Sequence, residues 1–158
     1  MKDPEALSEF DLGIVYHEPH FSDAFVLCQG ALHFNLYASK NYLERHGIPK
    51  DLQDLKENHK ICLRTDFENL WPEWNVLFHN EKNIVIRTDS SNVLLNLVKN
   101  DLGVSFLPSF TADDSLVQIL KDEVKIEQPF WIICPHHLKD VPKVRALMEY
   151  IKQTTEKL

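Results

Sequence analysis

The chain has 158 residues, of which 44% are hydrophobic and 26% charged, a composition typical of a soluble globular protein. Its 17 basic and 24 acidic residues give a net charge of −7, which argues against direct nucleic-acid binding because phosphates attract a basic surface. No run approaches the roughly 18 apolar residues of a membrane span, and the polar start MKDPEALSEF lacks the apolar core of a signal peptide, so neither membrane nor export is expected.

The three cysteines predict neither a disulfide framework nor a metal site. Cys28, Cys62 and Cys134 are widely separated, lie among apolar neighbours and form no CxxC pair or zinc-ligand set. Free buried thiols in a reducing cytoplasm are the simplest interpretation. We therefore expect a cytoplasmic protein without metal or cofactor.

Apolar runs in the first half of the chain predict strands over residues 10–16, 24–28, 31–38 and 61–63. Ser39 and Asp51 are typical helix caps, so helices are expected over residues 40–46, ended by Gly47, and 52–56. The stretch from residue 66 to 80 predicts an irregular loop, in which Trp71 and Trp74 are either aromatic core or a wall of a binding site.

Residues 83–108, NIVIRTDSSNVLLNLVKNDLGVSFLP, predict a strand, a helix and a second strand. The β-branched run 84–86 favours a buried strand, and residues 88–91 are of the types that cap a helix N-terminus. The apolar residues over 93–98 are too many for a helix with one wet side, so we expect a buried helix. Gly103 suits the left-handed residue beyond its end, and Pro108 closes the second strand. Such a crossover is parallel and right-handed.

Beyond Pro108, a helical turn is expected to lead into residues 116–120, followed by strands over 124–126 and 130–134. His136 and His137 form a pair without a third metal ligand, which favours a surface loop. A closing helix is predicted from Pro142 to about Lys157, with apolar residues at helical spacing. Strands that alternate with helices place the chain in the α/β class.

Several of these stretches have the order and spacing of one family. They are DLGIVY, LYASKNYLERHGIP, DLQDLKENHKICLR, NDLGVSFLP and WIICPHHLKDVPKVRALMEYI. Together they resemble the effector-binding domain of LysR-type transcriptional regulators, with its SxxYLxxxGxPxxxxDL, GxGxxxLP and PxxxxxxPxVRxxxxxL elements. The matching residues are Ser39, Tyr42, Leu43, Gly47, Pro49, Asp54, Leu55, Gly103, Leu107, Pro108, Pro135, Pro142, Val144 and Arg145. The chain departs from the family at Asp101, where the first glycine of GxG is usual.

The resemblance implies a type II periplasmic-binding-protein fold, with two lobes joined by two crossing strands. Residues 30–126 would form the second lobe, and residues 1–29 with 127–158 would form a remnant of the first. Nothing in the chain resembles the family's winged helix-turn-helix or the opening part of the first lobe, so that lobe is expected to be incomplete. It should then expose apolar sheet surface, which favours self-association and a homo-oligomer.

The best candidate for a ligand site is the cap formed by Thr88, Asp89, Ser90 and Ser91. It is either a helix cap and no more, or a place where hydroxyls and N–H groups hold a carboxylate. Regulators of this kind often sense small organic anions, which supports the second interpretation by analogy. Leu107 and Pro108 would line the same inter-lobe cleft, or serve only packing.

Three further residues are weaker candidates for ligand contact. His33 and Asn35 lie on a crossing strand whose alternation could direct both side chains into the cleft. His17 follows the first strand, with His20 nearby, and could contact an acidic ligand or belong to a solvated loop. No GxSxG element surrounds any serine and no glycine-rich phosphate loop is present, so no catalytic residue is assigned.

The predicted function is therefore effector sensing in a LysR-type regulator and not catalysis. A small organic anion would bind between the lobes and change the geometry of the DNA-bound oligomer, with DNA contacted only through a segment absent from this chain. Two alternatives stay open. One is a solute-binding protein for transport, and the other is a truncated regulator fragment that acts by association with an intact partner.

Overall fold

The computed structural model describes residues 11–19, 24–65 and 82–155. The contacts between residues divide the chain into two units, which we call unit 1 (residues 1–32 and 127–158) and unit 2 (residues 33–126). Among the described residues, no helix is both long enough and apolar enough to cross a membrane. Trp71, Trp74 and His20 lie outside the described residues, so the predictions made for them stay predictions.

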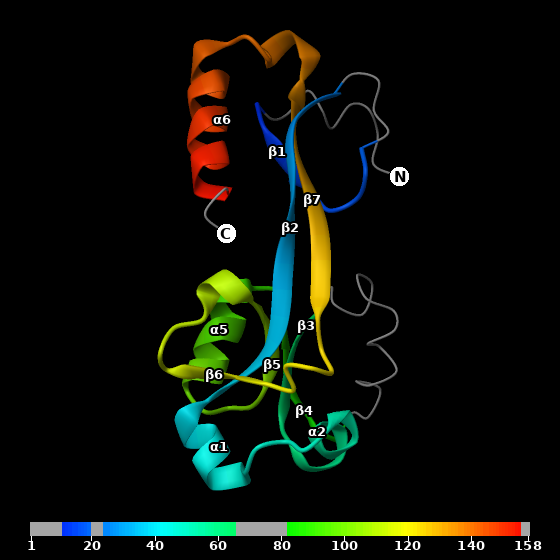
Figure 1. Ribbon diagram of the computed structural model, residues 1–158, viewed down its shortest axis with the longest axis vertical. Coiled ribbons are helices and arrows are strands. Elements are labelled where there is room, and N and C mark those ends of the chain that lie inside the picture. The colour runs from blue at the N-terminus through cyan, green and yellow to red at the C-terminus, as the bar shows by residue number, and fades with distance from the viewer. Residues whose placement is uncertain (1–10, 20–23, 66–81, 156–158) are drawn as a thin grey trace. The chain divides into compact units, whose positions relative to one another are not determined.

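Unit 2 contains most of the secondary structure, coloured from cyan to yellow in Figure 1. Strand β2 (Ala24–Ser39) begins in unit 1 and ends in unit 2. It is followed by helices α1 (Lys40–His46) and α2 (Leu52–Asn58), strands β3 (Ile61–Arg64) and β4 (Ile84–Thr88), helix α5 (Ser91–Lys99), strand β5 (Ser105–Pro108), the 3-10 turn η2 (Ser109–Thr111) and strand β6 (Leu116–Ile119).

The strands of unit 2 pair in the order β4, β3, β5, β2 and β6. Strand β2 pairs antiparallel with β5 on one side and with β6 on the other. Strands β3 and β4 are parallel, and a parallel bridge between Ile61 and Val104 connects β3 to the start of β5. The predicted strand–helix–strand crossover is therefore present as β4, α5 and β5, with β3 lying between its two strands.

The helix caps predicted from the sequence are confirmed. The Ser39 side chain accepts a hydrogen bond from the N–H of Tyr42 at 3.1 Å, and the Asp51 carboxylate accepts one from the N–H of Asp54 at 2.7 Å. Ser90 is the N-cap of α5. These bonds satisfy N–H groups that have no partner within the first turn of a helix, so each fixes the start of its helix.

The expectation that α5 and β4 are buried throughout is wrong. Leu94 and Val98 of α5 are buried, but Val93 is 46% exposed, so the helix keeps one face toward solvent. In β4, Val85 is exposed at 42% and only partial burial is seen on either side of it. Strand β4 has β3 as its described neighbour and ends the sheet order, which explains why its apolar run is half-buried.

Gly103 does not occupy the left-handed position after α5, as the sequence suggested. The residue with positive φ there is Asp101, at 64°. Its carboxylate accepts a hydrogen bond from the Ser39 hydroxyl at 2.5 Å and pairs with Arg45, and these contacts hold the unusual conformation. Gly103 is required for a different reason: a Cβ there would lie 2.5 Å from the carbonyl oxygen of Lys60.

Unit 1 consists of one helix packed on a small sheet. Strand β7 (Ile126–Pro135) pairs antiparallel with β1 (Gly13–Val15) and lies next to β2 in the strand order. The turn η3 (His136–Leu138) leads to helix α6 (Pro142–Thr155), shown alongside these strands in Figure 1. The buried residues of this core are Leu27, Phe130, Ile132, Cys134 and Val144.

Three expectations about individual elements need correction. The two apolar runs over residues 24–38 form one continuous strand, β2, which begins in unit 1 and ends in unit 2. Residues 124 and 125 are outside the strands, although Val124 is buried, and the strand expected there begins at Ile126 as part of β7. The residues after Pro108 form a 3-10 turn, and residues 116–119 form a strand that completes the sheet beside β2.

Candidate functional site

The carboxyl ends of three strands of unit 2 meet at one edge of its sheet. Arg64 at the end of β3 is in register with Thr88 at the end of β4, and Pro108 ends β5. Strand β2 runs in the opposite direction, so its residues Phe34 and Asn35 lie opposite Pro108 and Leu107. The structure thus brings the predicted residues of β2, β4 and β5 to the same edge, the position where open α/β sheets bind ligands.

The first turn of α5 is built by local hydrogen bonds. The N–H of Ser90 donates to the Thr88 hydroxyl at 3.2 Å, and the Ser90 hydroxyl accepts from the N–H of Val93 at 3.4 Å. The N–H of Leu94 donates to the carbonyl of Ser90 at 3.0 Å, as the first bond of the helix. The cap interpretation of these serines is therefore confirmed. A further role in binding an anion stays a prediction.

Arg64 is a residue of this edge that the sequence interpretation missed. Its guanidinium Nη1 donates to the hydroxyl of Ser91 at 2.8 Å, which places a permanent positive charge at the N-terminus of α5. The partial positive charge of the helix terminus has the same sign, so the two reinforce each other. The available signal was its position, since Arg64 ends an apolar strand just as Thr88 does.

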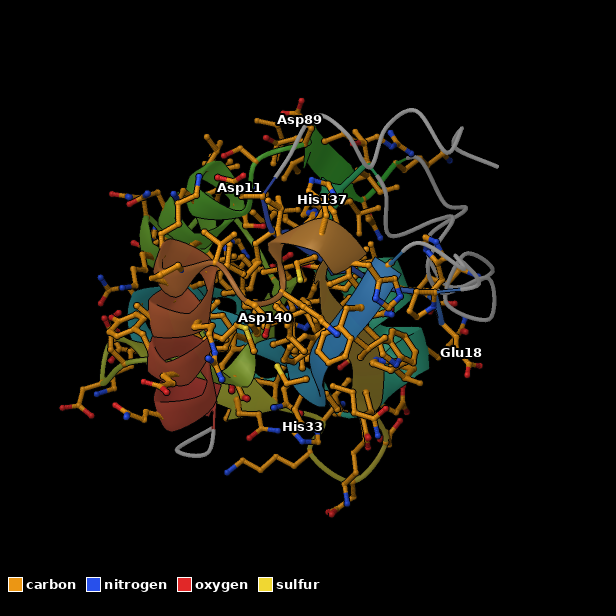
Figure 2. The ribbon with its side chains drawn as sticks, turned by 90° about the horizontal axis from the view of Figure 1, so that it is seen from above. Asp11, Glu18, His33, Asp89, His137 and Asp140 are labelled. Carbon is orange, nitrogen blue, oxygen red and sulfur yellow. The ribbon has the colours of Figure 1, made fainter. Side chains whose placement is uncertain are left out.

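Asp89 has the opposite effect on the local charge. It lies between β4 and α5, and its side chain is exposed, as its place at the periphery in Figure 2 shows. A carboxylate near a helix N-terminus stabilises the helix, but it also repels an incoming anion. Arg64 and Asp89 therefore act in opposite directions on any negatively charged ligand at this edge.

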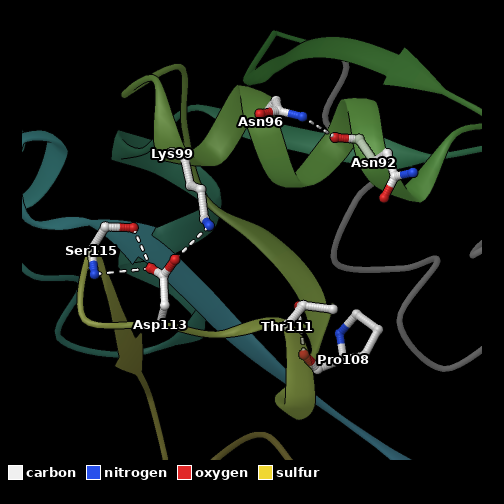
Figure 3. A network of polar contacts seen from close by, with 7 residues as sticks. All are labelled: Asn92, Asn96, Lys99, Pro108, Thr111, Asp113 and Ser115. Carbon is white, nitrogen blue, oxygen red and sulfur yellow. Dashed lines mark hydrogen bonds and ion pairs between the residues drawn. The ribbon is translucent and has the colours of Figure 1, made fainter.

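Polar contacts fix the segment that follows β5 (Figure 3). The Thr111 hydroxyl donates to the carbonyl of Pro108 at 2.7 Å and fixes the turn η2. Asp113 pairs with Lys99 of α5 at 2.6 Å and accepts from the Ser115 hydroxyl and N–H at 2.5 and 3.0 Å. The Lys99 ammonium, together with these Ser115 contacts, holds the pKa of Asp113 well below its usual range. The segment after β5 is thus tied to α5.

The other predicted residues differ in their exposure. Leu107 is buried at 1%, which agrees with the packing alternative, while Pro108 and Asn35 are half-buried. His33 is exposed. His17 follows β1 in unit 1 and is also exposed, so it belongs to a different unit from the other candidates.

Reactive or metal-binding chemistry has no support in the part of the chain that the structure describes. No group of three or more His, Cys, Asp or Glu side chains there could hold a metal ion. Burial raises the pKa of the Cys62 thiol to about 11, and burial also raises the pKa of Cys134. Both thiols are therefore protonated near neutral pH, unlike nucleophilic cysteines, whose pKa is lowered.

Comparison with known proteins identifies relatives of the chain. The model of the LysR substrate binding domain family matches residues 5–156. The probable HTH-type transcriptional regulator LtrA of Klebsiella pneumoniae is 28% identical over 137 residues, which make up 77% of this chain and 43% of that protein. The chain thus spans less than half the length of this curated relative.

Solved structures show the same fold. The regulatory domain of CrgA, a LysR-type regulator from Neisseria meningitidis, has a TM-score of 0.73 at 19% identity, over 94% of this chain and 76% of that one. The regulatory domain of AphB from Vibrio vulnificus has a TM-score of 0.65 at 21% identity, over 93% and 77%. The effector binding domain of QuiR in complex with shikimate has a TM-score of 0.63 at 18% identity, over 95% and 74%. The predicted α/β fold is confirmed.

Proposed function

The chain belongs to the family of LysR substrate-binding domains, and on this premise we propose that it binds a small carboxylate effector at the N-terminus of α5. It is an effector-binding regulatory domain of a family of transcriptional regulators and not of enzymes. This membership decides against the transport alternative. The identity of the effector and the residues that contact it are part of the proposal.

The observation that carries the proposal is the hydrogen bond between Arg64 and Ser91. It fixes a guanidinium group at the first residue of α5, directly after the cap that Ser90 and the Thr88 hydroxyl form. A carboxylate at this position would accept charge-assisted hydrogen bonds from the guanidinium and bonds from the first N–H groups of the helix. Asn35 and Pro108, at the same edge, would contact the rest of the ligand.

Binding alone does not regulate transcription, because a ligand shifts an equilibrium only when it prefers one of two states. We propose that the effector prefers one arrangement of a homo-oligomeric regulator in the cytoplasm. DNA would be bound by another segment of that regulator, since this chain carries a net charge of −7.

The test is isothermal titration calorimetry of the chain with a panel of small organic acids. Shikimate belongs to this panel because the related domain of QuiR was solved with it. Each acid that binds is compared with its uncharged amide. We expect the amide to bind at least about tenfold more weakly, because a hydrogen bond to a charged group contributes roughly 1.5–3 kcal/mol.

Three variants locate the site. Arg64→Gln should weaken acid binding by about tenfold or more, and Asp89→Asn should strengthen it because a repulsive charge is removed. Arg45→Gln is the matched control, since Arg45 lies on α1, which follows the other end of β2, and pairs with Asp101. Equal affinities of the original chain and of Arg64→Gln would contradict the proposed site.

A further inference from the structure

Unit 1 contains a groove that is not part of the effector site proposed above. It has a volume of about 340 Å³, which is at the lower end of the range for small-molecule sites. Its walls come from the start of β2 and from the segment that runs from the end of η3 into α6. Both walls belong to unit 1, so the groove is formed within one unit and is separate from the α5 edge of unit 2.

The floor of the groove is apolar and accessible. Phe25 is 37% exposed and Val26 is 42% exposed, although both lie in a strand. Phe25 and Leu27 lie on one face of β2, because alternate residues of a strand point to the same side, and Met148 of α6 lines the groove with them and packs against the buried core of unit 1. Exposed apolar side chains that line one concavity favour an apolar group of a ligand, since its burial removes their surface from water.

The rim of the groove carries three charged side chains. Lys139 and Arg145 are cationic, and Asp140, labelled in Figure 2, is the single carboxylate among the lining residues. The Lys139 ammonium lies 5.7 Å from the centre of the Phe25 ring, where the ring also meets the His136 imidazole edge-on at 5.9 Å. These contacts place Phe25 directly beside positive charge.

We propose that this groove binds a small organic monoanion with an apolar body. The apolar body lies against Phe25, Leu27 and Met148, and the carboxylate accepts hydrogen bonds from Arg145 and Lys139. The three charged rim groups sum to one positive charge, which a monoanion neutralises. A dianion would leave an excess negative charge next to Asp140, and a cation would be repelled by the two basic groups.

This site is independent of the one proposed at the α5 N-terminus. It uses different residues in a different unit, and its ligand is recognised by an apolar surface as well as by charge. A regulator with two sites can respond to two small molecules, provided that each prefers one of the same two states.

The probe for the test is 3-phenylpropionate, a monoanion with an apolar ring, with its neutral amide and phenylsuccinate, a dianion, as comparisons. Backbone amide shifts in NMR spectra of the full chain report where each molecule binds, and titration gives its affinity. We expect the shifts to concentrate over residues 25–27 and 139–148. The amide and the dianion should each bind about tenfold or more weakly.

Variants of the two walls complete the test. Arg145→Gln should weaken binding of 3-phenylpropionate by about tenfold or more, and Phe25→Ala should also weaken it, because the apolar body loses its contact with the ring. Lys143→Gln is the matched control, because Lys143 lies on the same helix but pairs with Asp11 outside the groove. Its affinity should stay within about twofold of the original, and retained thermal unfolding would show that each variant is folded.

Three results would overturn the proposal. The first is equal binding of the acid and its amide. The second is shifts that concentrate over residues 88–92, which would place the probe at the α5 edge. The third is a concentration-dependent dimer in sedimentation experiments that Phe25→Ala dissociates, which would make the groove an interface between copies of this chain.

Discussion

Replacing Gly103 by Ala should destabilise unit 2 through a steric clash and not through backbone conformation. A Cβ at this position would lie 2.5 Å from the carbonyl oxygen and 2.9 Å from the carbonyl carbon of Lys60, whereas ordinary van der Waals contact begins at 3.4 Å. Both obstructing atoms are backbone atoms of Lys60, which cannot move aside as the end of a flexible side chain can. The chain around residue 60 or residue 103 must therefore move.

The magnitude follows from what that movement disturbs. The N–H of Val104 donates to the carbonyl of Lys60 at 2.8 Å, and the N–H of Cys62 donates to the carbonyl of Val104 at 2.9 Å. Overpacking in a well-packed core costs about 1–3 kcal/mol, and each weakened hydrogen bond adds roughly 0.5–1.5 kcal/mol. We expect the free energy of unfolding to fall by about 2–4 kcal/mol.

Urea denaturation followed by circular dichroism measures this loss, and hydrogen exchange locates it. The amides of Cys62 and Val104 should exchange faster in Gly103→Ala. Gly47→Ala is the control, because Gly47 has a φ of 84° with no atom within 4 Å of an added Cβ. That substitution strains only the backbone at residue 47. The amides of Cys62 and Val104 should then exchange no faster than the global stability of that variant predicts.

A Gly103→Asn variant distinguishes the two reasons why residue 103 could have to be glycine, a left-handed conformation or a close approach to Lys60. A residue required for left-handed conformation is replaced better by Asn than by Ala, because Asn adopts positive φ more readily. A residue required for close approach tolerates Asn less well, because its side chain is larger. A Gly103→Asn variant more stable than Gly103→Ala, or a loss below about 0.5 kcal/mol in Gly103→Ala, would refute the steric argument.

Three further outcomes are expected. Ser39→Ala should lower the unfolding free energy by about 1–2 kcal/mol in urea denaturation, because the variant loses the cap of α1 and the bond to Asp101. Leu94→Ala should cost about 2–5 kcal/mol, whereas Val93→Ala should cost under about 1 kcal/mol, because Leu94 is 1% and Val93 46% exposed. Burial lowers the pKa of His59 below its ordinary value of 6.5, so the unfolded chain binds a proton more readily than the folded chain. The free energy of unfolding should therefore fall as the pH drops from 7 through 6.5 and down to the lowered pKa of the folded chain. His59→Gln should make this fall less steep, and an unchanged slope would contradict the assignment to His59.

The elements of unit 2 were largely predictable because their signals are local. Ser39, Asp51 and Ser90 each act within one helical turn of their own position, so the sequence alone identifies them as caps. The strand boundaries were less predictable. Residues 124–126 were predicted as a strand from the sequence, but Val124 is buried in the core without being part of a strand.

The candidate site was predictable in part, for the same reason. The polar run that starts at Thr88 lies between a strand and a helix, and that order of elements is visible in the sequence. The contribution of Arg64 was not predictable from the sequence, because its contact with Ser91 joins residues 27 positions apart. Only the parallel register of β3 with β4 brings the two together.

The sequence by itself determined the α/β class, the helix starts and the family, because helix caps, the periodicity of apolar residues and motif spacing all depend on residues close together in the sequence. Only the tertiary structure decided why Gly103 is a glycine, since the obstructing carbonyl belongs to Lys60, which directly precedes β3 and is remote in the sequence. It also decided that Asp101 takes the left-handed conformation, because its contacts come from the cap Ser39 and the last-turn residue Arg45 of α1, which are distant in the sequence. Pairing between remote segments depends on the whole chain's packing, which no local pattern encodes.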